Sequence, residues 1–209
     1  MQHIFFDLDG TLTDPFVGIT TCMQEALRTL GETVPSKEAL SWCIGPPLRD
    51  NFVQLVGEEV ADQGVALYRS RFNEVGWREN EVYEGIENCL QQLLGDNKNL
   101  YVASSKLHIF VDRILQHFEL AQYFSAIYGS ELDGTRANKA QLLEFALRQQ
   151  QLDGADCVMV GDRKHDCLGA NHNRMKAVGV LWGYGSKEEL KAHTPNLVAD
   201  ISNLPSYLD

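Results

Sequence analysis

The chain has 209 residues, of which 44% are hydrophobic and 22% are charged, a composition typical of a folded globular protein rather than a disordered one. Its formal net charge of -11 argues against unassisted binding to a nucleic-acid polymer or to an anionic membrane surface, although a metal or a local basic pocket can still attract an anionic substrate. The five cysteines lack CxxC spacing, and the apolar run at the N-terminus is too short for a signal peptide or a membrane span, so we expect free buried thiols and a cytoplasmic protein.

The first predicted element is a strand over HIFFDLD, residues 3–9, in which a short apolar run, residues 4–6, leads into two carboxylates, Asp7 and Asp9. Residues two apart in a strand project to the same side, so the carboxylates should converge, and Gly10 lets the backbone turn away behind them. Such neighbours repel unless a cation lies between them, and Mg²⁺ sites typically combine a few carboxylates with substrate phosphate oxygens. By itself, this pattern fits a solvated pair at a strand end equally well.

Residues 15–80 contain no strong strand pattern, and we predict that they form a small all-helical domain inserted after the first strand. Apolar residues from Ile19 to Leu30 have helical spacing, Gly31 is suited to end that helix, and further helical stretches follow Ser36 and Pro47. Most aromatic residues of the insertion should form its own core, although some of them, and Arg71, are candidates for contacts with a substrate.

From residue 81 onwards, short apolar runs alternate with helical patterns. The runs cover residues 100–104, 125–130, 157–162, 177–183 and, more weakly, 196–200. Uninterrupted apolar runs suit strands buried on both faces, and their alternation with helices predicts right-handed βαβ units. Residues 1–14 and 81–209 are therefore expected to form an α/β core, with a Rossmann-like parallel sheet of about six strands.

Two more carboxylates, Asp162 and Asp166, follow the apolar run that ends at Gly161. The carboxyl ends of parallel strands line one edge of a sheet, where ligands bind. Asp7, Asp9 and these two residues can therefore gather at one edge from distant parts of the chain. Four carboxylates in one place strongly favour a bound metal ion.

Two further positions could bind an anion. Ser104 and Ser105 follow the run LYVA, where we expect the strand to end and a helix to begin near Ser105. A hydroxyl with free helix N–H groups can hold an anion, although a serine there is equally common as a helix cap. Lys139 follows the predicted N-cap Asn138, so its charge opposes the helix dipole. Contact with a phosphate explains this position better than helix stability does, and a solvated lysine is the alternative.

These four stretches, in this order, resemble the haloacid dehalogenase superfamily of aspartyl-phosphate hydrolases over essentially the whole chain. DLDGTLTD resembles the first motif, Ser104 the second, Lys139 the third and GDRKHD the fourth. The insertion is similar to the small cap domain of the phosphoglycolate phosphatase-like branch. CIGPPL, GSELDGTR and MVGDRKHD resemble more closely members described as 5′-nucleotidase-like.

The resemblance implies that Asp7 is the nucleophile that forms an aspartyl-phosphate, while Asp9 protonates the leaving alkoxide and later deprotonates the attacking water. It also implies a Mg²⁺ ion held by Asp7, the backbone carbonyl of Asp9 and Asp162, with Asp166 nearby or bound through water.

The same resemblance implies that Ser104, with Ser105, and Lys139 bind the transferring phosphoryl group. Arg49, which follows the loop-like stretch CIGPPL, is a candidate contact for the leaving group in the inserted domain. His165 is expected to lie near the metal without binding it directly.

The expected function is therefore Mg²⁺-dependent hydrolysis of a small phosphorylated metabolite, such as a 5′-nucleotide or phosphoglycolate, by a monomer or homodimer. A second aspartate at position 9 argues against halide release, because dehalogenases of this superfamily lack it. Two alternatives stay open: a sugar-phosphate mutase with the same motifs, and a non-catalytic regulator that binds phosphate esters.

Overall fold

The structure, a computed structural model, describes residues 2–208. The chain divides into two compact units. The core unit comprises the residues up to Asp14 and those from Val82 onwards, and the helical unit comprises Pro15–Glu81. Among the described helices, none is long and apolar enough to cross a membrane.

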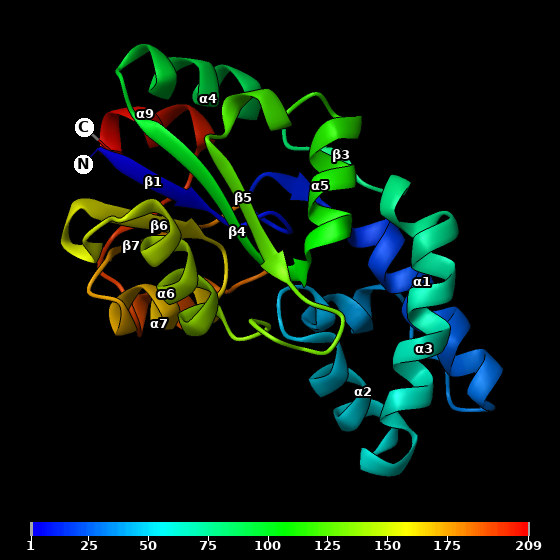
Figure 1. Ribbon diagram of the computed structural model, residues 1–209. Coiled ribbons are helices and arrows are strands. Elements are labelled where there is room, and N and C mark those ends of the chain that lie inside the picture. The colour runs from blue at the N-terminus through cyan, green and yellow to red at the C-terminus, as the bar shows by residue number, and fades with distance from the viewer. Residues whose placement is uncertain (1, 209) are drawn as a thin grey trace. The chain divides into compact units, whose positions relative to one another are not determined.

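Six parallel strands form the sheet of the core unit, in the order β5-β4-β1-β6-β7-β8 (Figure 1). The strands are β1 (His3–Phe6), β4 (Asn99–Leu107), β5 (Ala126–Ser130), β6 (Cys157–Gly161), β7 (Lys176–Val180) and β8 (Leu197–Val198). The central strand β1 lies between β4 and β6, with Phe6 opposite Val102 and Val160. The predicted parallel α/β sheet is therefore confirmed.

Helices cover both faces of this sheet. They are α4 (Ile86–Gly95), α5 (His108–His117), α6 (Lys139–Gln150), α7 (Lys164–His172), α8 (Lys187–Lys191) and α9 (Leu204–Leu208). Figure 1 shows α6 and α7 on one side of the sheet and α4 and α9 on the other. Phe5 and Met159 pack with residues of α6 and α7 in one hydrophobic cluster, while Ile4 and Phe6, which alternate with Phe5, are also fully buried. Burial on both faces explains the unbroken apolar sequence of the strands.

Two helices of the core unit begin at capping residues, one of which is the predicted N-cap Asn138. The side chain of Asn138 accepts hydrogen bonds from the N–H groups of Ala140 and Gln141 at the start of α6. The hydroxyl of Ser186 accepts one from the N–H of Glu189 at the start of α8. Each cap pairs N–H groups that the first helical turn leaves without a partner.

The end of β4 differs from the prediction. The strand does not stop at residue 103 or 104 but continues to Leu107, and α5 begins at His108. The pairing with β5 changes register between Ala103 and Leu107, and Leu107 lies opposite Ser130. Ser105 is therefore not at a helix N-terminus, because pairing with β5 keeps this polar stretch extended.

The helical unit contains α1 (Phe16–Leu30), α2 (Leu48–Val56) and α3 (Glu58–Glu74), with 3-10 segments at Glu38–Cys43 and Gly76–Arg78. Phe52, Tyr68 and Phe72 are buried, and the rings of Tyr68 and Phe72 stack at 5.4 Å. These aromatics form the core of the unit, as expected. Short strands β2 (Thr13–Asp14) and β3 (Glu81–Val82) pair where the chain passes between the units.

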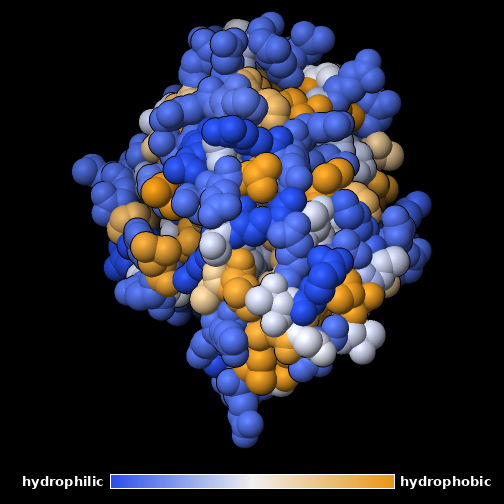
Figure 2. Space-filling model, turned by 90° about the vertical axis from the view of Figure 1, so that its right-hand side faces the viewer, coloured by the Kyte–Doolittle hydropathy of each residue, from blue (hydrophilic) through white to orange (hydrophobic). Residues whose placement is uncertain are grey.

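The exterior agrees with the composition. Hydrophilic residues cover most of the face drawn in Figure 2, and hydrophobic residues occur among them in patches. All five cysteines are free and buried, which confirms the predicted free thiols.

Candidate active site

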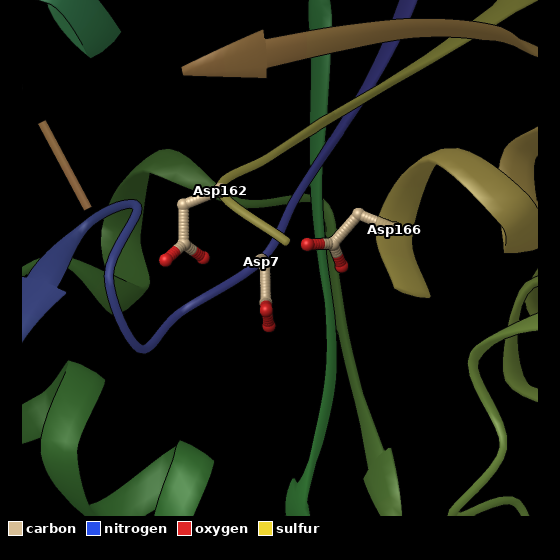
Figure 3. Close-up of side chains that lie close together, drawn as sticks. All are labelled: Asp7, Asp162 and Asp166. Carbon is tan, nitrogen blue, oxygen red and sulfur yellow. The ribbon is translucent and has the colours of Figure 1, made fainter. Parts of the chain in front are cut away.

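Neighbouring strands bring three carboxylates together in the core unit. Asp7 follows β1, Asp162 follows the adjacent strand β6, and Asp166 lies in the first turn of α7. All three are buried, and one carboxylate oxygen of each lies within 4.8 Å of those of the other two. Figure 3 shows their side chains converging from these separate elements. The predicted gathering of distant carboxylates at one sheet edge thus holds for these three residues.

The Asp9 side chain lies outside this cluster. Its Oδ2 accepts a hydrogen bond from Nζ of Lys106 at 2.5 Å. The expected convergence with Asp7 assumed a strand reaching Asp9, but β1 ends at Phe6 and the next residues form a tight turn in which Gly10 has a φ of 79°. The expected metal contact of Asp9 is through its backbone carbonyl, and that contact stays a prediction.

Charge repulsion and burial act together on the three carboxylates. Burial raises the pKa of Asp162 well above its usual range, and the charges of the nearby Asp166 and Asp7 raise it further. The N–H of Tyr184, which donates to Asp162 Oδ2 at 2.7 Å, lowers this pKa in part. Burial also raises the pKa of Asp166, to about 6. A divalent cation bound here would offset this repulsion, and a set of carboxylate oxygens fits Mg²⁺, Ca²⁺ or Mn²⁺. These residues therefore fit the implied metal ion.

Lys139, the first residue of α6, supplies a buried positive charge to the same site. Its Nζ lies 2.7 Å from the carbonyl oxygen of Ala103, 3.1 Å from Asp7 Oδ1 and 2.8 Å from Asp166 Oδ1. Burial lowers the pKa of Lys139, but the charges of Asp166 and Asp7 outweigh it, so the pKa is raised overall. Lys139 thus links the backbone of β4 at Ala103 with the carboxylates of Asp7 and Asp166.

A backbone hydrogen bond also orients Asp7, whose Oδ1 accepts from the N–H of Leu8 at 2.8 Å. Ser104 is buried in β4, and its Oγ accepts from the N–H of Lys106 at 3.4 Å. Ser105 is half-buried, with its carbonyl accepting a hydrogen bond from the Ser130 hydroxyl. The phosphoryl-binding roles of Ser104 and Ser105 stay predictions.

The segment after β7 closes over Asp162, and sequence reasoning missed it. A Cβ on Gly183 would lie 2.3 Å from the carbonyl oxygen of Gly10 and 2.4 Å from Asp162 Cβ, so only glycine fits. The hydroxyl of Tyr184 donates to Asp14, and Trp182 Nε1 donates to the carbonyl of Thr11 at 3.0 Å. The glycines of WGYG directly after an apolar run were the available signal.

Lys106 is the other residue that sequence reasoning missed. It stands two positions after Ser104, so in an extended strand both side chains project to the same side. The prediction of a helix start near Ser105 hid this relation.

The two predicted arginines belong to the helical unit. Arg49 belongs to α2 of the helical unit, where its exposed guanidinium pairs with Glu58 at 2.7 Å and Asp62 at 2.8 Å. Arg71 is held by ion pairs with Glu25 and Glu79.

His165 is half-buried beside the site. Burial lowers its pKa, and the charges of Arg163 and Lys164 lower it further. Its ring is not part of the cluster of described ligand groups, and the expectation that it lies near the metal without binding it directly stays a prediction.

Comparisons with known proteins relate this chain to one family of hydrolases. A model of the family described as haloacid dehalogenase-like hydrolase matches residues 4–180. A protein named 5′-nucleotidase from Pseudomonas aeruginosa is 46% identical over 210 residues, which cover 99% of this chain and 95% of that protein. The tyrosine-protein kinase PtkA of Mycobacterium tuberculosis is 34% identical over 97% of this chain and 70% of its own length. The crystal structure of a predicted phosphatase from Clostridium acetobutylicum superposes with a TM-score of 0.96 at 37% identity, covering 99% of this chain and 97% of that one.

Proposed function

The chain belongs to the haloacid dehalogenase-like hydrolase family, and from this premise we propose that it is a Mg²⁺-dependent phosphatase of small phosphomonoesters, of the 5′-nucleotide or phosphoglycolate type. The observation that carries the proposal is the buried group of Asp7, Asp162 and Asp166. Lys139 forms ion pairs with Asp7 and Asp166 of this group. The 46% identity with a protein named 5′-nucleotidase favours nucleotides among the substrates.

Asp7 is the proposed nucleophile. Its carboxylate attacks phosphorus, the bond between phosphorus and the leaving-group oxygen breaks, and an aspartyl-phosphate forms. Contacts from Leu8 N–H and Lys139 to Oδ1 limit rotation of the carboxylate, which favours one orientation for attack. Lys139 also reduces the repulsion between this carboxylate and an anionic substrate.

Asp9 is the proposed general acid and base. In the first step its carboxyl group gives a proton to the departing alkoxide. In the second step it takes a proton from a water molecule that attacks the aspartyl-phosphate, so phosphate leaves and Asp7 is regenerated. The side chain of Asp9 has a different environment from that of Asp7, because it contacts Lys106 rather than the carboxylate cluster.

Asp7, Asp162 and the backbone carbonyl of Asp9 would hold the Mg²⁺ ion, with Asp166 close by. When bound, the ion supplies charge neutralisation at the phosphoryl oxygens and at the clustered carboxylates. Ser104 and Lys139 are the proposed partners of the transferring phosphoryl group.

The test is phosphate release from a panel of 5′-nucleotides, phosphoglycolate and sugar phosphates, with Mg²⁺ and in excess EDTA. Asp7→Asn is the matched control, because it keeps the shape of the side chain but removes the nucleophile. We expect it to keep the fold by circular dichroism and to lose more than about nine-tenths of kcat. Mass spectrometry of rapidly quenched wild-type protein should find a phosphoryl group on the peptide that contains Asp7. Absence of phosphate release from every phosphomonoester tested would refute the proposal.

A second candidate is transfer of the phosphoryl group to an acceptor other than water. The 34% identity with PtkA favours it, and the mutase alternative belongs to the same class of reaction. Supplying ATP with a tyrosine-containing peptide, or a sugar phosphate alone, and following phosphopeptide and isomer formation beside phosphate release distinguishes the candidates.

A further inference from the structure

Lys106 and Asp9 form a buried ion pair next to the carboxylate cluster. Nζ of Lys106 donates to Oδ2 of Asp9 at 2.5 Å, and the two side chains are only 9% and 10% exposed. The other oxygen, Oδ1 of Asp9, is also buried, and it has no hydrogen-bond partner among the described residues. A buried polar atom of this kind requires an explanation, because an unpaired acceptor costs about 1–3 kcal/mol.

The backbone around Lys106 is shaped by the irregular pairing of β4 with β5. The register shifts between Ala103 and Leu107, and the hydroxyl of Ser130 donates to the carbonyl of Ser105 at 2.9 Å. A Cβ on Gly129 would lie 2.5 Å from His108 Cα and 2.9 Å from the Lys106 carbonyl oxygen, so β5 approaches this stretch as closely as a glycine allows. Irregularities of this kind commonly lie beside active sites, where they redirect a side chain.

The N–H of Lys106 also donates to Oγ of Ser104, at 3.4 Å. One short stretch of β4 therefore contributes both the serine predicted to bind the phosphoryl group and the lysine that holds Asp9. The backbone position of Lys106 depends on Ser130 and Gly129 of the neighbouring strand, so the lysine is directed to Asp9 by the sheet itself.

We propose that Lys106 is a positioning residue for Asp9: its ammonium group holds Oδ2, so that the unpartnered Oδ1 is the oxygen that exchanges a proton with the leaving group. This inference rests on the proposed function, in which Asp9 is the general acid and base. A carboxylate fixed through one oxygen keeps the other in a limited set of orientations, and proton transfer requires hydrogen-bond reach of the reacting atom. The competing role for Lys106 is direct contact with the phosphate of the substrate.

The two roles differ in how they depend on the leaving group. A poor leaving group needs a proton as its bond to phosphorus breaks, whereas a good one departs as an anion. A phosphate contact serves every substrate equally, because every substrate carries the same phosphoryl group. Para-substituted phenyl phosphates, from 4-methylphenyl to 4-nitrophenyl phosphate, vary the pKa of the departing phenol with little change of shape.

The experiment measures kcat/KM for this series with wild-type protein, Lys106→Met and the control Lys187→Met, in which an exposed lysine of α8 is changed. kcat/KM reports the steps up to formation of the aspartyl-phosphate. For Lys106→Met we expect a loss of about tenfold to a hundredfold on the poorest leaving groups, because misplacing Asp9 removes only part of the roughly 10²–10⁴-fold that general acid catalysis contributes, and a loss of less than about threefold on 4-nitrophenyl phosphate. The plot of log kcat/KM against phenol pKa therefore becomes steeper, and Lys187→Met keeps the wild-type slope.

A parallel shift of the whole line for Lys106→Met would overturn the inference, because a phosphate contact or a general structural role affects all substrates alike. An unchanged line would overturn it as well. If Lys106→Met fails to fold by circular dichroism, Lys106→Gln, which is shorter and neutral but still polar, is measured against the same expectation of a steeper slope. If wild-type protein hydrolyses none of the aryl phosphates, nucleotides, phosphoglycolate or sugar phosphates, the proposed function itself fails, which is distinct from an active enzyme with an unchanged slope.

Discussion

Replacing Lys139 by methionine tests the electrostatic reasoning about the site most directly. The substitution removes a buried positive charge that lies 3.1 Å from Asp7 Oδ1 and 2.8 Å from Asp166 Oδ1. Each of these pairs has a gross Coulomb energy of about 4–6 kcal/mol at an effective dielectric constant of ~20, before the penalty for burying the charges. Breaking a buried pair by removing one partner typically costs about 3–5 kcal/mol. We expect Lys139→Met to lower the free energy of unfolding by that amount in the absence of metal.

The loss of unfolding free energy in Lys139→Met should depend on pH, because Asp166 titrates. Burial raises the pKa of Asp166, the charge of Lys139 lowers it, and Asp7 raises it, with a result of about 6 in the folded protein. This is above the usual value of about 3.9 in an unfolded chain. A group with a raised folded-state pKa contributes stability that is present below the unfolded pKa and lost as pH rises through the folded pKa. Removing Lys139 raises the pKa of Asp166 further, so the variant should be impaired more at a pH of about 8 than at a pH of about 5.

Urea unfolding of wild-type protein, Lys139→Met and the exposed-lysine control Lys187→Met, at both pH values and in EDTA, measures this effect. Mg²⁺ binds the ionised carboxylates of the folded state, so adding it should recover part of the loss at the higher pH. A difference from wild type below about 1 kcal/mol at the higher pH, or the same difference at both pH values, would refute the reasoning.

Three other predictions concern the metal, the glycine segment and the helical unit. Excess EDTA should abolish phosphate release, and Mg²⁺ should restore more activity than Ca²⁺, whose looser coordination misplaces Asp7; full activity in EDTA would exclude a metal role. Gly183→Ala places a Cβ 2.3 Å from the Gly10 carbonyl oxygen, so it should destabilise the protein by about 1–3 kcal/mol in urea unfolding. It should also raise the Mg²⁺ concentration needed for half activity, and wild-type values for both quantities would contradict the predicted packing. Arg49→Ala should change the ranking of substrates by kcat/KM, and an equal loss on all substrates would remove Arg49 from the leaving-group contacts.

Much of the core unit follows from local sequence patterns. Unbroken apolar runs identify strands buried on both faces, and the cap residues Asn138 and Ser186 identify helix starts, because these features depend on neighbours a few residues away. The strand ends place Asp7 and Asp162 at one edge, since the carboxyl ends of parallel strands meet there. The α/β class and the carboxylate cluster were therefore predictable.

Other features depend on register and packing between distant segments. Pairing with β5, rather than the local preference of a polar stretch, keeps residues 104–107 extended. That pairing directs Lys106 to Asp9, 97 residues away, and the packing of α6 against β4 places Lys139 between Asp7 and Asp166. The sequence by itself indicated that Asp7, Asp162, Asp166 and Lys139 reach this edge of the sheet, but not that Lys106 does. Only the tertiary structure decided which of them touch, because a side-chain contact depends on the exact register of strands and helices that the sequence pattern of any one element does not contain.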